Sequence, residues 1–314
     1  MAGGRPESAP IEPGTEGGLE EEVERGDEGG LRPEAGEPDP DDVLLQPLMH
    51  TGPWFYITAA ILLCFVGLGV FAYQYQFRNG LGVTGLNRPV YWGVYIVNFV
   101  FFIGISHAGT LISAILRICG AEWRRSITRC AEVITVLVLF FGVGSILVDL
   151  GQPLRALFVI THAHMRSPLL WDVCSISTYL TGSLIYLYLP MIPDIALLRD
   201  RMPWRRWLYG PLSLGWTGTP RQHALLEKAI AVMAVVIIPI AVSVHTVVSW
   251  VFAMTVQPMW HSAIFGPYFV VGAIFSGIAA LIVSMVILRK AYGLQDYIKP
   301  IHFNHLGALL LVFT

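Results

Sequence analysis

The chain has 314 residues, of which 54% are apolar and only 13% are charged. Soluble domains are about 45–50% apolar and about 25% charged, so this composition excludes a single compact soluble fold. The charges are also unevenly divided, because residues 1–42 carry 14 of the 22 acidic residues but only three of the 20 lysines and arginines. Residues 43–314 are therefore an apolar body with an excess of basic residues, which fits a lipid bilayer.

Residues 1–42 are predicted to be a disordered acidic tail. The segment is rich in Gly, Pro and Glu and has almost no aromatic residues. It cannot bury enough apolar surface to offset the entropy lost on folding. Its acidic start also lacks the positive and apolar stretches of a signal peptide, so we expect the mature chain to begin at or near Met1.

Residues 43–314 are predicted to form an all-α, multi-pass transmembrane domain. A helix needs about 20 apolar residues to cross the hydrocarbon core, and six segments meet this requirement. A seventh apolar segment stops too early to cross, so we expect the sequence to be part of a longer chain. The predicted helices lie near residues 54–77, 90–118, 129–150, 169–198, 226–256, 263–288 and, incomplete, 301–314.

The lysines and arginines of the loops predict the orientation in the membrane. The loops after the second, fourth and sixth predicted helices carry thirteen of them, whereas the loops on the opposite side carry four. Because cytoplasmic loops are enriched in Lys and Arg, this difference places the N-terminus and the acidic tail in the cytoplasm. The loop around His162 then lies on the outer side.

Two histidines are predicted to lie near the middle of the membrane, where a polar group costs several kcal/mol. His107 shares a face of the second predicted helix with Thr110, and His245 lies on the fifth. Each imidazole is a candidate ligand or proton carrier. A structural histidine that bonds a neighbouring helix is an equally good interpretation of His107.

Two carboxylates are predicted near the outer surface. Asp172 lines one face of the fourth predicted helix with Ser175 and Tyr179, and Asp149 ends the third. Both are candidate proton acceptors. As alternatives, Asp172 could only stabilise the start of its helix, and Asp149 could only cap the following turn.

Two further carboxylates, Glu132 and Asp194, are predicted near the inner ends of their helices. Together with His245 they could form a proton path. At this depth a solvated or snorkelling role is the more favoured interpretation, by about two to one. Separately, the four cysteines stand singly, with no CxxC pair and no histidine at zinc spacing, so the sequence predicts no metal or iron–sulfur site and four small packing residues.

Three segments make residues 44–314 resemble the NrfD and polysulfide reductase family of membrane subunits. Within this family the likeness is greatest to the larger quinol-oxidising membrane subunit of bacterial alternative complex III. The segments are ISHAGTLISAILR (105–117), WDVCSISTYL (171–180) and VHTVVSWVFAMTVQPMWHSAIFGPYFVVGAIFSG (244–277).

The resemblance implies four-helix transmembrane bundles in a bacterial inner membrane, and no haem, metal or cluster in this chain. It also implies a quinone site on the outer side, at His107 and Asp172, facing an iron–sulfur partner subunit. Other membrane subunits and cytochrome c subunits would complete the complex, and no nucleic acid is implied. The likeness departs at Val251, where many relatives carry Asp. Because Val251 cannot supply a carboxylate, Asp149, Asp172 and His245 become the stronger candidates for the quinone pocket and the proton path.

The sequence therefore predicts a membrane subunit that binds and oxidises quinol near the outer face, with proton translocation as an additional expectation. Quinol oxidation releases two protons and two electrons, so the site needs hydrogen-bond acceptors and a route for protons. The electrons must pass to a partner subunit. The residues predicted to contact the quinone are His107, Thr110, Ser175, Tyr179 and His245; Asp172 and Asp149 would accept protons, and Glu132, Asp194 and His245 would form a proton path.

Three rival functions remain open. A cytochrome b-like protein could use His107 and His245 as axial haem ligands. A secondary transporter could use the buried acids and histidines as proton relays. An anchor subunit of the same family could reduce quinone instead of oxidising quinol. Menaquinone and ubiquinone are equally compatible with the sequence.

Overall fold

The computed structural model describes residues 52–86, 92–254 and 261–314. The predicted tail (1–42) and the predicted helix residues 90–91 and 255–256 lie outside the described residues. Contacts divide the chain into two units, Met1–Leu63 and Cys64–Thr314. All contacts given below lie within the second unit.

The described residues fold into helices, and no strand occurs in that part of the chain. Six of the helices are long and apolar enough to cross a membrane, which confirms the predicted all-α, multi-pass fold. These six are α3 (Pro53–Asn79), α4 (Val94–Ile118), α5 (Arg125–Asp149), α7 (Pro168–Arg201), α9 (Pro220–Ala253) and α10 (Phe265–Ala291), and the shorter apolar helix α11 (Pro300–Val312) follows them.

The loops contain short helices that the sequence did not predict. None is longer than seven residues, so none offers the repeated pattern by which a longer helix is recognised. They are η1 (Leu81–Thr84), η2 (Glu122–Arg124), η3 (Pro153–Arg155), α6 (Ala156–Thr161), η4 (Pro203–Arg205) and α8 (Arg206–Leu212).

Two spanning helices, α5 and α9, begin several residues earlier than the apolar pattern predicts, because their first turns are polar. In α9 the difference is six residues. Pro220 occupies the first helical position, where its missing N–H costs no hydrogen bond. Thr219 and Gln222 form a capping box, in which each side chain bonds the backbone of the other residue. The helix therefore starts outside the apolar segment that crosses the membrane.

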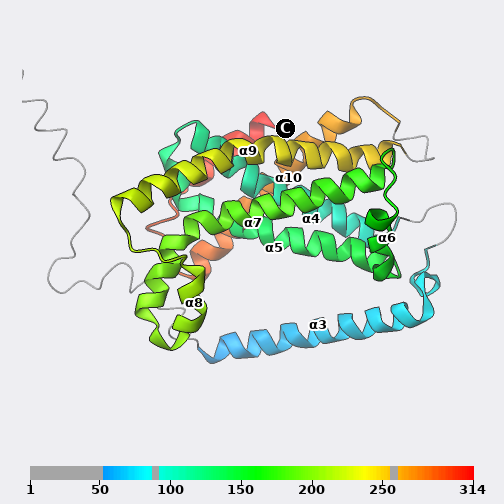
Figure 1. Ribbon diagram of the computed structural model, residues 1–314, viewed down its shortest axis with the longest axis horizontal. Coiled ribbons are helices and arrows are strands. Elements are labelled where there is room, and N and C mark those ends of the chain that lie inside the picture. Colours follow the sequence, from blue (N-terminus) through cyan, green and yellow to red (C-terminus); the bar gives the residue numbers. More distant parts are fainter. Residues whose placement is uncertain (1–51, 87–91, 255–260) are drawn as a thin grey trace, which may run out of the picture. The chain divides into compact units, whose positions relative to one another are not determined.

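Helix α4 lies at the centre of the bundle and packs against α5, α9 and α10, while α7 packs against α9 and α5 (Figure 1). Of the most apolar part of α4, 76% is buried, against 33% in α5, α7, α9 and α10. Side chains of three helices meet in the core, among them Ile103 on α4, Ile237 on α9 and Ile278 on α10, all completely buried. Functional groups on the buried faces of α4 are therefore shielded by other helices.

The outward-facing surface of these helices is apolar. Phe101, Leu137, Val235 and Val283 are each between 54% and 60% exposed, although all are large apolar side chains. Lipid tails satisfy such a surface, whereas water does not. The protein is a multi-pass membrane protein.

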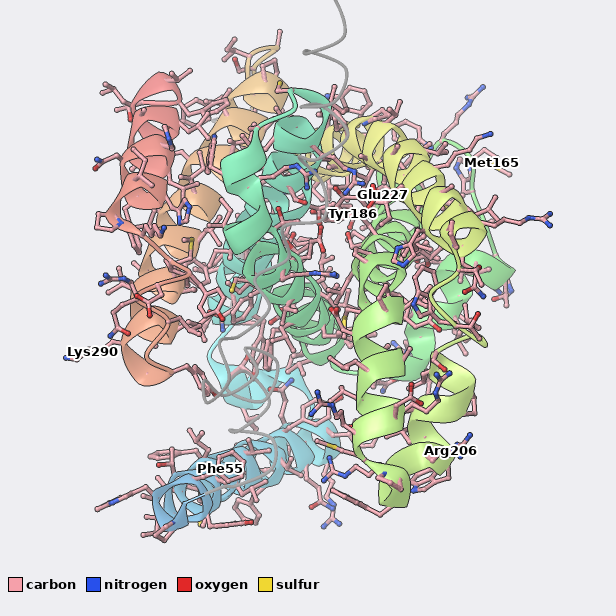
Figure 2. All side chains as sticks on the ribbon, turned by 90° about the vertical axis from the view of Figure 1, so that its left-hand side faces the viewer. Phe55, Met165, Tyr186, Arg206, Glu227 and Lys290 are labelled. Carbon is pink, nitrogen blue, oxygen red and sulfur yellow. The ribbon has the colours of Figure 1, made fainter. Side chains whose placement is uncertain are left out.

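Basic side chains gather at one end of the bundle, where α4, α7 and α10 end and α5 and α9 begin. Figure 2 looks along the bundle from this end and shows Arg206, Glu227 and Lys290 there. Arg117, in the last turn of α4, forms an ion pair with Glu227 near the start of α9. The alternating helices thus bring together the loops that carry most of the positive charge.

The close packing of α4 on α5 depends on Gly109. A Cβ atom on this residue would collide with the Ala131 carbonyl and the Thr135 hydroxyl of α5. Small residues allow the backbones of membrane helices to approach closely, which strengthens their van der Waals contact. Gly109 lies two residues from His107, so this contact also holds that part of α4 in place.

We predict that Gly109→Ala destabilises the protein by about 1–3 kcal/mol, because the added methyl group must separate α4 from α5. Thermal unfolding in detergent measures the effect. Gly144→Ala on α5 is the matched control, since a Cβ atom there meets no described neighbour within 4 Å. Equal melting temperatures for the two variants would contradict this account of the packing.

Candidate functional site

Two imidazole rings meet in the centre of the bundle. His107 on α4 and His245 on α9 are both completely buried, and their ring centroids lie 3.8 Å apart at an angle of 52°. The Nε2 atom of His245 lies 3.1 Å from the carbonyl oxygen of Ile103. A carbonyl only accepts, so this Nε2 carries a hydrogen and donates it. His245 is thereby fixed in orientation against α4.

His107 lacks a hydrogen bond of this kind. Neither of its ring nitrogens has a hydrogen-bond partner among the described residues. The structural interpretation, in which His107 bonds a neighbouring helix, is therefore wrong for this arrangement. A buried imidazole without a partner is costly in an apolar surrounding, and this cost is commonly tolerated at sites that bind a ligand.

The pair does not have the geometry of axial haem ligands. A metal between two imidazoles lies about 2 Å from each coordinating nitrogen, which holds the ring centroids more than about 6 Å apart. The measured 3.8 Å leaves no space for a porphyrin between His107 and His245. No group of three His, Cys, Asp or Glu side chains that could hold a metal occurs in the described ranges either.

Polar side chains of three helices surround the imidazole pair. Tyr179 on α7 lies with its ring centroid 6.3 Å from that of His107, and its hydroxyl donates to the Ser106 carbonyl over 2.9 Å. Thr135 on α5 donates to the same carbonyl, also over 2.9 Å. Thr110, predicted to share a face with His107, is 3.5 Å from Ser183 on α7. The structure therefore brings four of the predicted site residues, His107, Thr110, Tyr179 and His245, into one region of the bundle.

The polar contacts continue from this level toward the basic end of the bundle. Ser113 on α4 donates to Glu132 on α5 over 2.8 Å and lies 3.2 Å from the hydroxyl of Tyr186 on α7. Figure 2 shows Tyr186 inside the bundle. Glu132 is only 2% exposed. The favoured interpretation of Glu132 as a solvated or snorkelling side chain is therefore wrong.

The polar side chains that follow one another along α4, α5 and α7 between Asp172 and Glu132 are called the polar file below. Sequence reasoning missed several of its members, although their spacing in the sequence indicated them. On α4 and on α7, small polar or tyrosine side chains recur every three or four residues and so share one face of each helix. Each of these residues is unremarkable alone, and only the spacing distinguishes them from ordinary helix residues. The missed residues are Ser106, Ser113, Thr135, Ser183 and Tyr186.

The carboxylates of Asp172 and Asp149 lie toward the opposite end of the bundle, at the start of α7 and the end of α5. Asp172 is seven residues before Tyr179 on α7, so the two share a face and are separated by about 10 Å along the helix. The Oδ1 atom of Asp172 is buried and has no hydrogen-bond partner in the described part of the chain. The hydroxyl of Ser175, also predicted here, donates to the backbone carbonyl of Asp172.

Asp149 is the last residue of α5, and its Oδ1 atom is likewise buried without a hydrogen-bond partner among the residues described. Next to it, the carbonyl of Val148 accepts a hydrogen bond from Gln76 on α3 over 3.0 Å. Tyr95 in turn donates to Gln76. These bonds join α3, α4 and α5 near Asp149.

The remaining predicted residues lie outside this polar file. Asp194 on α7 is exposed and forms an ion pair of 3.3 Å with Arg129. The cysteines, predicted to be small packing residues, lie outside the core, because Cys64, Cys119 and Cys174 are exposed and Cys130 is half-buried. They are all free thiols.

A groove of about 640 Å³ lies between α4 and α10. Gly104, one turn before His107, lines it together with Phe269, whose ring centroid is 6.3 Å from that of His245. Val100, Val271 and Phe275 make much of its wall apolar, and Tyr268, Ser276 and Thr314 also line it. An apolar ligand in this groove would lie one side chain away from the imidazole pair.

Comparison with known proteins gives a family match over most of the chain. Residues 82–313 match the family described as polysulphide reductase, NrfD. A relative from Halobacterium salinarum, described as a putative membrane subunit of dimethyl sulfoxide reductase, is 30% identical over 238 residues. These residues are 76% of this chain and 52% of that protein.

Two further relatives are more distant. A selenate reductase subunit of Mesobacillus selenatarsenatis is 25% identical over 80% of this chain and 60% of its own length. The Hdr-like menaquinol oxidoreductase integral membrane subunit of Archaeoglobus fulgidus is 23% identical over 74% of this chain and 50% of its own length. The chain thus spans about half the length of the curated relatives it matches, and it belongs to the polysulphide reductase NrfD family of membrane proteins.

Proposed function

We propose that this chain is the quinone-binding membrane subunit of an oxidoreductase complex and that quinol is oxidised beside His107. One observation carries the proposal: His107 is completely buried, has no hydrogen-bond partner among the described residues, and lies in the middle of a polar file across the bundle. A relative of this chain is a menaquinol oxidoreductase subunit by name, which supports a quinone as the substrate class.

The groove between α4 and α10 is the proposed route of the quinol. Its apolar wall suits an isoprenoid tail, and Gly104 offers no side chain that would block the head group. The head group would reach His107 by displacing the ring of Phe269. A hydroxyl of the quinol would then donate to a nitrogen of His107, for which the described residues offer no other partner.

Protons released from the quinol would leave toward the outer side. Tyr179 lies beside His107, and Asp172 follows two helical turns further along the same face of α7. Asp172 is the proposed acceptor, with Asp149 as the alternative, because the buried oxygen of each carboxylate has no hydrogen-bond partner within the described ranges. Ser175 lies between Asp172 and Tyr179 on α7.

A second proton path would connect the imidazole pair with the basic end. Thr110 and Ser183 form one hydroxyl pair, and Ser113, Tyr186 and Glu132 form the next polar group along the bundle, so a proton would pass from the first group to the second. Arg129 is three residues before Glu132 and is paired with Asp194, which would form the exposed end of this path. Such a path would allow proton translocation to accompany quinol oxidation.

The electrons would pass to a partner subunit with iron–sulfur clusters on the outer side. The likeness to the larger quinol-oxidising subunit of alternative complex III extends this proposal to further membrane subunits and cytochrome c subunits in a bacterial inner membrane. In this arrangement the N-terminus and the basic end of the bundle face the cytoplasm.

We predict that Asp172→Asn lowers the rate of quinol oxidation by about 10² to 10⁴ in the intact complex, because it removes a positioned base while keeping its size. Quinone affinity and assembly should change little. Asp200→Asn on the same helix is the matched control, since Asp200 is exposed and pairs with Arg199. A wild-type rate for Asp172→Asn would show that this carboxylate does not accept the proton.

We predict that Glu132→Gln abolishes proton movement across proteoliposomes while quinol oxidation falls only a few-fold, because the outer path remains open. The amide can still accept the hydrogen bond from Ser113. Glu227→Gln, at an exposed position of the same end, should behave like the wild type. Full proton translocation by Glu132→Gln would refute the inner path.

We predict that a Cys introduced at His164 reacts with a membrane-impermeant maleimide added to intact cells, whereas one introduced at Thr217 does not. The two positions are exposed and belong to loops at opposite ends of the bundle. The unequal distribution of Lys and Arg sets the expected direction. Labelling of Thr217→Cys alone would reverse the orientation.

A further inference from the structure

We propose that a groove between α5 and α10, at the basic end of the bundle, binds an anionic phospholipid. The phosphate would contact Arg129, and one acyl chain would follow the groove toward the middle of the membrane. The site is separate from the imidazole pair and does not depend on quinone chemistry.

The groove has the shape and position of an acyl-chain site. Its volume is about 420 Å³. From Arg129 to Leu137 it follows α5 for about 12 Å, most of the roughly 15 Å of hydrocarbon that one leaflet provides. It is lined by Arg129, Val133 and Leu137 on α5 and by Ser284, Ile287 and Leu288 on α10.

The apolar walls of the groove are open to the bilayer. Val133 is 40% exposed, Leu137 54% and Ile287 60%. Lipid tails therefore contact these side chains wherever no other protein covers them. A groove limits the motion of one tail, so a lipid whose head group is also held would remain there longer than its neighbours.

Arg129 provides the hydrogen-bond donors for a head group. Its side chain is 41% exposed. The hydrogen bond to the Pro190 carbonyl and the ion pair with Asp194 both use the Nη2 atom, while Nη1 is buried and has no hydrogen-bond partner among the described residues, so a phosphate would contact it only after the half-exposed side chain turned toward the groove. A guanidinium carries five N–H groups in a planar fork that matches phosphate oxygens. The two contacts of Nη2 therefore leave other N–H groups of Arg129 as donors for a phosphate.

The charge of this end of the bundle selects an anionic lipid. Most lysines and arginines of the membrane domain lie in the loops at this end, and they attract negative head groups. The competing ion pair is weak, because Asp194 is 62% exposed and lies 3.3 Å from Arg129. A quinone head group is uncharged and would gain nothing from this field, which favours a phospholipid as the occupant.

Native mass spectrometry of the detergent-extracted protein tests the proposal. Phosphatidylglycerol and phosphatidylcholine with identical acyl chains are titrated separately, and we expect one phosphatidylglycerol to bind preferentially. Arg129→Gln should weaken its binding about fivefold, the effect of one basic residue near a membrane surface. Arg206→Gln, an exposed position on α8 at the same end, is the control and should leave the affinity unchanged.

Two further variants keep the test decisive if Arg129→Gln does not fold. Ile287→Trp fills the groove without touching the guanidinium and should lower the affinity for phosphatidylglycerol. Asp194→Asn removes the competing carboxylate and should raise it about two- to fivefold. Equal affinities for the two lipids, or unchanged phosphatidylglycerol binding in Ile287→Trp and Asp194→Asn, would overturn the proposal.

Discussion

The carbonyl oxygen of Ser106 joins three helices, and the arrangement of the site depends on it. Tyr179 from α7 and Thr135 from α5 both donate to this oxygen. No water is available in the hydrocarbon core, so polar groups there need partners within the protein. The Tyr179 hydroxyl and the Thr135 hydroxyl, which lies at a similar distance from the Ala131 carbonyl of its own helix, both contact this one atom and so hold α5 and α7 against α4. Because His107 is the next residue, the same bonds set the position of its imidazole.

The architecture could be predicted because hydrophobic length alone defines a membrane-crossing helix. The apolar segments and the charges of the loops were sufficient to find α3, α4, α5, α7, α9 and α10 and to place their basic ends together. The first residues of the helices were harder to predict. Pro220 and the capping box of Thr219 begin α9 in a polar segment, where a search for apolar residues finds no signal.

The site could be predicted only in part, because its members come from different helices. The composition of the spans identified His107 and His245, but their contact depends on how α4 packs against α9, over a separation of 138 residues. The burial of Glu132 was missed for the same reason. Its position near the end of α5 predicted a solvent-exposed side chain, whereas the packing of the helices turns it toward Ser113 and away from solvent. Depth follows from counting residues, but direction follows from tertiary packing.

The 3.8 Å between the two imidazole rings restricts how charge can accumulate at the site. Two positive charges at this distance repel by about 4 kcal/mol even at an effective dielectric constant of 20. Two excess protons on the histidine pair are therefore strongly disfavoured. A two-proton reaction at this position must proceed in two steps, with the first proton gone before the second arrives. The rate of the whole reaction would then depend on how quickly the site is emptied, a timing constraint that arises from the contact of two rings.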